Sequence, residues 1–129
     1  MKTSEYDKLI KIEKDIIYCF SIIYPKIKQT LLSQIPLIEK VHRDFTNIGV
    51  FISFKFKDNN YKKNSFSKKL IINDLYLISN ELEYESAITM HLEKDGKIDY
   101  IELFGGFKTK RYPNEYKIIY KDTHIIVDD

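Results

Sequence analysis

Apolar residues near the start of the chain recur every three or four positions, which is the spacing of one face of a helix. The pattern runs from Ser4 to Tyr24 and predicts an amphipathic helix with Ser4 as its N-cap. Pro25 either begins a second helix or kinks one long helix, and Pro36 ends the pattern. Because the apolar face is broad and the polar face mixes acids with lysines, we interpret this region as a cover for a core rather than a membrane-surface helix.

After Pro36 the apolar residues alternate with polar ones, which is the pattern of strands with one face on a core. The expected strands cover residues 38–45, 50–57, 74–79, 86–94, 97–104 and 116–121. Asp95-Gly96 suits a tight turn between two of them, and the lysine-rich segment 58–69 is expected to be an exposed loop. The final HIIVDD adds a further edge to the expected sheet.

The order of these elements, helices first and strands afterwards, is typical of an α+β domain. We predict a single domain over residues 1–129, helical at 4–35, with an antiparallel meander of about five to six strands within 38–127. An N-terminal helix or kinked helix pair packs on this sheet. The hydrophobic fraction of 43% is that of a globular protein, and the chain has no internal repeats.

Charge and cysteine content exclude several classes of protein. The formal net charge of +2 is too small to indicate a nucleic-acid or membrane partner by itself. Cys19 is the single cysteine, which excludes an intrachain disulfide and favours a reducing compartment. Because no signal peptide or membrane-spanning run is recognised, we expect a cytoplasmic protein without a membrane partner.

The reactive side chains form no recognisable catalytic constellation. His42, His91 and His124 lack metal-type spacing, and Cys19 lies in the apolar run YCFSII, where a buried thiol is inert. The glycines form no phosphate-binding loop before a helix. We therefore expect no catalytic residues, no metal site and no cofactor, in a protein that is not an enzyme.

Two segments resemble a pattern found in a group of small, mostly uncharacterised bacterial proteins. Residues 41–51, VHRDFTNIGVF, resemble a V-x-R-x-F-T-x-x-G-x-F hairpin, and residues 95–104, DGKIDYIELF, resemble D-G-x-I-x-x-L-E-x-[YF], with Tyr112-Pro113 following. The chain departs from the pattern at residues 84–87, where glycines are usual. The group is similar to immunity proteins encoded beside polymorphic or contact-dependent toxins. The resemblance implies a protein that neutralises a cognate toxin by covering it, and it supplies no active-site residues.

Two charged residues of these segments share a strand face with apolar neighbours. Side chains two residues apart in a strand point to the same face, so Glu102 is expected on the face of Ile98 and Tyr100, and Arg43 on the face of Val41. A buried carboxylate needs a partner, so one hypothesis is a structural ion pair between Arg43 and Glu102. The alternative is a β-bulge near Tyr100 that turns Glu102 outward.

The remaining functional signal is the separation of charges along the chain. Lysines gather between residues 55 and 69, including Lys62, Lys63, Lys68 and Lys69, with Tyr61 and Phe66 between them. Acids gather in the hairpins that follow, where the predicted partner-binding residues are Glu81, Glu83, Tyr84, Glu85, Asp95 and Asp99. An acidic surface of this kind suits a cationic partner such as a nuclease toxin. The alternatives are solvated loops and a nucleic-acid-binding accessory protein that uses the lysines; a homodimer is compatible with either function.

Overall fold

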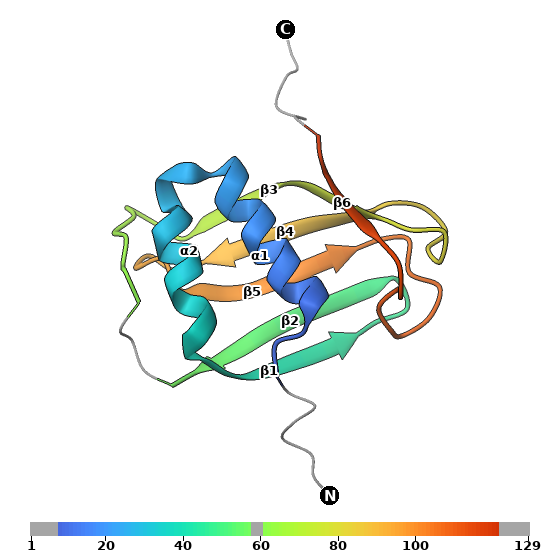
Figure 1. The fold of residues 1–129 in the computed structure, drawn as a ribbon, viewed down its shortest axis with the longest axis horizontal. Helices are drawn as coiled ribbons and strands as arrows, with labels where there is room; N and C mark the ends of the chain where they lie inside the picture. Colours follow the sequence, from blue (N-terminus) through green and yellow to red (C-terminus); the bar gives the residue numbers. More distant parts are fainter. Residues whose placement is uncertain (1–7, 58–60, 122–129) are drawn as a thin grey trace, which may run out of the picture.

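The structure, a computed structural model, describes residues 8–57 and 61–121, where helices cover one face of a six-stranded antiparallel sheet (Figure 1). The helical layer consists of α1 (Lys11–Ile23), the 3-10 turn η2 (Pro25–Ile27), α2 (Lys28–Gln34) and the 3-10 turn η3 (Ile35–Leu37). The strands are β1 (Ile38–Phe45), β2 (Gly49–Phe56), β3 (Leu70–Ile78), β4 (Ser86–Leu92), β5 (Ile98–Phe104) and β6 (Lys117–Tyr120). The α+β class predicted from the sequence is confirmed.

The first helix begins later than the sequence pattern indicates. Residues 8–10 are not helical, α1 starts at Lys11, and the predicted cap Ser4 lies outside the described residues. The Glu13 carboxylate accepts a hydrogen bond from the Ile10 N–H (3.1 Å), which satisfies a donor at this helix end. Pro25 begins η2, where a first-turn N–H would have no intrahelical partner, and this 3-10 turn separates α1 from α2, so they are two helices rather than one kinked helix.

The strands lie in the order β1-β2-β5-β4-β3-β6, and all neighbours are antiparallel. β3, β4 and β5 follow one another as a meander, and the β1–β2 hairpin joins this meander by pairing β2 with β5. The connection from β2 to β3 therefore crosses the β4–β5 turn, where the Phe66 N–H donates to the Lys94 carbonyl (2.8 Å). The edge expected in HIIVDD lies outside the described residues.

The connection between β2 and β3 is less exposed than the sequence indicates. Tyr61 is only 5% exposed, and its hydroxyl donates to the Asp95 carbonyl (3.3 Å). The Lys62 N–H donates to Ser33 Oγ (2.8 Å), and the Asn64 side chain hydrogen bonds to Thr30. These contacts tie the connection to α2 and to the β4–β5 turn.

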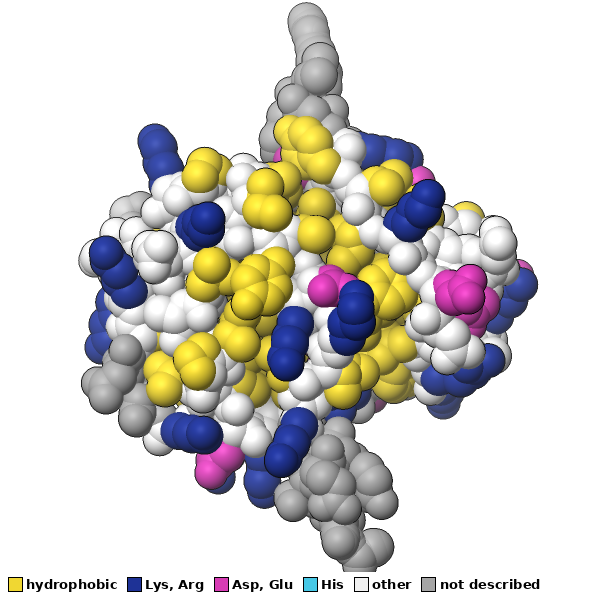
Figure 2. All heavy atoms as spheres, viewed as in Figure 1, with side chains coloured by type: hydrophobic (Ala, Val, Ile, Leu, Met, Phe, Trp, Pro, Cys, Tyr) yellow, Lys and Arg dark blue, Asp and Glu magenta, His cyan; other side chains and the backbone are white. Residues whose placement is uncertain are grey.

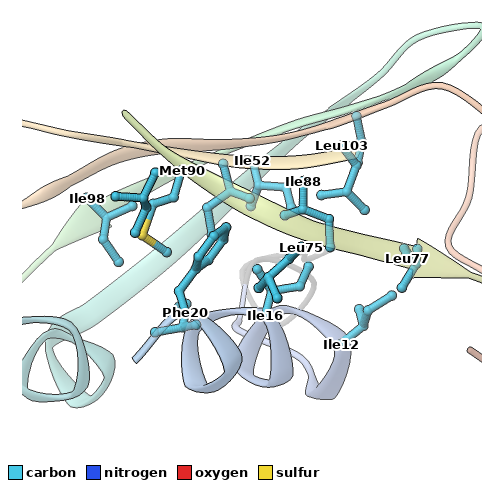
Figure 3. Packing of buried hydrophobic residues seen from close by; sticks show 14 of the residues in the cluster. Ile12, Ile16, Phe20, Ile52, Leu75, Leu77, Ile88, Met90, Ile98 and Leu103 are labelled. Atoms are coloured by element: carbon cyan, nitrogen blue, oxygen red, sulfur yellow. The ribbon is translucent and has the colours of Figure 1, made fainter. Parts of the chain in front are cut away.

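The core lies between α1 and the central strands (Figure 3). α1 contributes Ile12, Ile16 and Phe20, which pack against inward side chains of the sheet such as Ile88 and Met90. Full burial of one such side chain stabilises a fold by about 1.5–3 kcal/mol. This packing uses one face of the sheet and leaves the other face without a cover from any described residue.

A β-bulge in β5 sets which side chains point away from the core. Leu92 pairs with Ile98 but His91 pairs with Tyr100, so Asp99 is the extra residue. After the bulge Ile101 and Leu103 are buried, which directs the residues between and beyond them outward.

Candidate functional site

The six residues predicted to bind a partner do not form one surface. Glu81, Glu83, Tyr84 and Glu85 lie in the β3–β4 connection, whereas Asp95 lies in the β4–β5 turn and Asp99 in the bulge of β5. The seven residues of β4 separate the two connections, a length of about 20 Å. The acidic set is therefore divided between opposite ends of the sheet (Figure 1).

Three of these acids stabilise local structure. The Glu81 carboxylate accepts hydrogen bonds from the backbone N–H groups of Asn114 (3.0 Å) and Glu115 (2.9 Å), and these bonds lower the pKa of Glu81. Glu85 pairs with Lys121 (2.6 Å), and Asp95 Oδ1 accepts from the Lys97 N–H (3.1 Å). Glu83 and Tyr84 remain exposed, with Tyr84 at 60%.

The lysine-rich connection does not present its aromatic residues to solvent. Lys62, Lys63, Lys68 and Lys69 are exposed, and Lys69 lies 3.7 Å from Glu93. Tyr61 is buried and Phe66 packs against the core, so neither ring can stack on a base. Stacking of these rings on bases, which the nucleic-acid alternative uses, is therefore not favoured, because Tyr61 is buried and Phe66 is partly buried against the core.

Arg43 forms a buried ion pair, but its partner is Glu13 and not Glu102. The Glu13 side chain is 0% exposed, and its carboxylate accepts from Arg43 Nε (2.5 Å), Arg43 Nη2 (2.7 Å) and the Tyr112 hydroxyl (2.7 Å). Burial and the nearby carboxylate raise the pKa of Tyr112, so this hydroxyl remains a donor. The cluster joins α1 to β1 and to the loop before β6.

The Glu13 partner was missed by sequence analysis although the pattern contains a signal for it. Glu13 falls four residues after Leu9 and three before Ile16, within the apolar face of α1. An acid at such a position is buried unless the helix turns, and a buried carboxylate requires donors. The hypothesis of an Arg43–Glu102 pair is corrected by the bulge at Asp99, which places Glu102 on the opposite face of the sheet.

The uncovered side of the sheet carries a continuous set of large side chains. We call this side the open face; its outward residues include Asp44, Phe51, Ile71, Tyr76, Ala87, Thr89, His91, Tyr100, Glu102 and Phe104, with Lys40, His42, Ser53 and Lys55 on the outer strands β1 and β2. Phe51 is 40% exposed, and Ile71 and Phe104 are each 57% exposed. Lysines interrupt the apolar surface on the helix side (Figure 2), and on the open face Lys121 Nζ lies 5.0 Å from the centroid of the Tyr76 ring.

Aromatic rings and carboxylates alternate at the centre of the open face. Phe51 of β2 lies between Asp44 of β1 and Glu102 of β5 in the strand register, and Thr89 of β4 lies on the far side of Glu102. His91 stacks on Tyr100 at a centroid distance of 4.1 Å. Tyr84 extends this surface at one end, because its ring lies beside Gly105, the residue after Phe104.

The hollows of the surface are open grooves rather than enclosed cavities. One groove of about 530 Å³ lies between α1 and β6, where the Tyr116 hydroxyl donates to Asp15 (2.6 Å). Cys19 also lines it, and partial burial raises the pKa of this thiol, which disfavours the reactive thiolate.

Within residues 8–57 and 61–121, His, Cys, Asp and Glu side chains form no group of three that could hold a metal ion. No helix in the same ranges has the length and apolar character needed to cross a membrane.

The hairpin that carries the resemblance is explained by local structure. Thr46 Oγ1 accepts from the Gly49 N–H (3.1 Å) and the Ile48 N–H (3.2 Å), which fixes the turn. A Cβ atom on Gly49 would overlap the Leu103 carbonyl oxygen, so only glycine lets β2 approach β5 at this point.

Comparison of the chain with protein-family models, with curated proteins and with solved structures finds no match.

Proposed function

We propose that this chain is an immunity protein that binds a cognate bacterial toxin and occludes it, and that the toxin docks on the open face. The observation that carries the proposal is the uncovered sheet face with exposed Phe51, Ile71 and Phe104. The choice of a toxin as the partner comes from the resemblance of residues 41–51 and 95–104. On this proposal the protein acts in the cytoplasm without a cofactor or a reaction centre of its own.

The open face has the properties of a protein-docking surface. Soluble monomers rarely expose large contiguous apolar patches, and aromatic residues at the centre of a patch supply most of the binding free energy of protein interfaces. A paired sheet is a rigid scaffold, so these side chains are held in place before the partner arrives. Glu83 and Tyr84 lie at the end of the face, where they can contribute to the rim of the interface.

Nucleic-acid binding through the lysine-rich connection is a second candidate function. Exposed lysines of this connection lie beside Lys94 of the β4–β5 turn, which gathers positive charge at one end of the sheet. Without exposed rings, such binding would rest on phosphate contacts and would weaken steeply with salt. Fluorescence anisotropy with a labelled oligonucleotide at low and high salt tests it, and an unchanged signal at low salt rejects it.

The leading proposal predicts a toxic domain encoded beside this chain. Cells that express this domain alone should stop growing, and coexpression of the chain should restore growth. Phe104→Asp places a charge within the docking surface and should weaken the complex by at least about 100-fold. Ile22→Asp is the matched control, because Ile22 is 69% exposed on α1, which belongs to the opposite layer.

The two variants separate the possible results. Loss of protection and of complex formation by Phe104→Asp, with both retained by Ile22→Asp, supports docking on the open face. If Phe104→Asp still protects cells and still forms the complex, the open face is not the docking surface. Failure of the unmodified chain to protect cells or to bind the toxic domain rejects the immunity function.

A further inference from the structure

We infer that the partner places an arginine side chain on Phe51 at the centre of the open face, between Asp44 and Glu102. This inference rests on the proposed function, because it assumes that a protein covers this face. The partner's side chain at the centre of the interface is then a guanidinium group.

The carboxylates at this position have no cationic partner among the described residues. Asp44 and Glu102 lie directly on either side of Phe51 in the register of β1, β2 and β5. Adjacent strands are about 4.8 Å apart, so the two acids lie about 10 Å from each other across one ring. Neither carboxylate has a hydrogen bond or an ion pair to another residue in the ranges 8–57 and 61–121.

Covering this centre would be costly without cationic donors. A partner that buries Glu102 removes the water that solvates its carboxylate, and an unpaired buried carboxylate destabilises a complex. The hydroxyl of Thr89, directly across from Glu102, is already buried and has no hydrogen-bond partner among the described residues. This hydroxyl does not donate to Glu102, so the N–H donors that the carboxylate needs on burial must come from the partner.

Arginine fits this position better than lysine. Its planar guanidinium can stack on an aromatic ring while its edges donate to carboxylates on two sides. Phe51 supplies the ring, and Tyr100, whose centroid lies 6.1 Å from that of Phe51, extends the aromatic surface. A lysine ammonium is a compact, strongly hydrated charge that cannot stack in this way.

The test uses the full chain and small-molecule probes, so it does not depend on finding the toxin. N-acetyl-arginine amide is titrated into isotope-labelled protein while backbone amide signals are followed by NMR. We expect saturable shifts at Asp44, Phe51 and Glu102 with a Kd of roughly 10 mM, the strength of one exposed charged contact with a ring. N-acetyl-citrulline amide, which has the same shape without the charge, should give no saturable shift, and N-acetyl-lysine amide should bind at least about 3-fold more weakly.

Two variants make the result specific. Glu102→Gln keeps the size of the side chain and should weaken binding of the arginine probe by at least about 5-fold, and Asp44→Asn/Glu102→Gln should abolish it. Glu115→Gln is the control, because Glu115 is an exposed acid of the loop before β6, outside the open face. Equal binding of arginine and citrulline probes, or unchanged binding by the double variant, would overturn the inference.

The outcome is separable from that of the proposed function. If Phe104→Asp disrupts the toxin complex but the arginine probe does not bind, the docking surface stands and the arginine inference fails. If the arginine probe binds as expected but no toxin complex forms, the proposed function fails, whereas the affinity of the site at Phe51 for an arginine side chain is confirmed. Sedimentation that shows a dimer, converted to a monomer by Phe104→Asp, would assign the open face to a second copy and overturn the inference.

Discussion

The buried Glu13–Arg43 pair gives the sharpest test of the stability argument. Arg43→Met removes the guanidinium but retains much of the aliphatic length of the side chain. Among the described residues, the Glu13 carboxylate, which is 0% exposed, then keeps only the Tyr112 hydroxyl and the Ile10 N–H as donors. Removing one partner of a buried pair costs about 3–5 kcal/mol, because the other charge stays in a medium of low polarity.

This cost is large against the stability of a domain of this size. Native domains are stable by about 5–15 kcal/mol, so Arg43→Met should remove roughly a fifth or more of the free energy of unfolding. For 129 residues the melting temperature should fall by roughly 10–20 °C. Urea unfolding followed by circular dichroism measures the loss, and an unchanged slope shows that the unfolded state is the same.

A second variant and a control separate the charge from the packing. Glu13→Gln/Arg43→Met replaces the orphaned carboxylate with a neutral amide and should recover at least about 1–2 kcal/mol of the loss. Lys11→Met removes the exposed ion pair with Asp15, in which the lysine side chain is 83% exposed, and should leave the free energy of unfolding nearly unchanged. If Arg43→Met costs no more than Lys11→Met, or if the double variant is no more stable than Arg43→Met, the reasoning is refuted.

Two further predictions concern the loops at the end of the sheet that holds the β3–β4 connection. Gly106→Ala should destabilise the protein by at least about 2 kcal/mol in urea, because Gly106 has a φ of 81° and a Cβ there would overlap the Tyr84 carbonyl oxygen; a loss below about 0.5 kcal/mol contradicts this. Protection of the Asn114 and Glu115 amides from hydrogen exchange should be full above pH ~4.3, the ordinary pKa of a glutamate, and should fall as the pH drops through the lower folded-state pKa of Glu81. The same loss at neutral pH in Glu81→Gln would support this, and protection that is independent of pH would contradict it.

Most strands could be predicted because their alternation is local. The expected range 38–45 coincides with β1, and the expected ranges 50–57 and 97–104 differ from β2 and β5 by one residue. The start of α1 was predicted too early, because the apolar spacing continues through Leu9 although the capping contact of Glu13 begins the helix at Lys11. The expected strand 74–79 was too short, since β3 begins at Leu70 and contains an irregular register between Ile72 and Leu75.

The candidate site could not be predicted because it depends on pairing between distant strands. Grouping acids by sequence joined Glu81, Glu83 and Glu85 to Asp95, although β4 holds the two groups apart. The open face arises only when β2 pairs with β5, which brings Phe51 beside Glu102. The bulge was available as an alternative for Glu102, and the structure confirms that alternative.

The extra residue in β5 has a consequence for how such a chain can change over time. If the open face binds a partner as we propose, substitutions at Tyr100, Glu102 or Phe104 would alter recognition while Ile101 and Leu103 keep the interior intact. Deletion of Asp99 would instead shift the phase of the strand by one step and exchange its wet and dry sides. Point substitutions in this strand can therefore change its outward side chains and with them the specificity of binding. An insertion or a deletion would instead move apolar side chains to the surface, so changes in strand length are not expected.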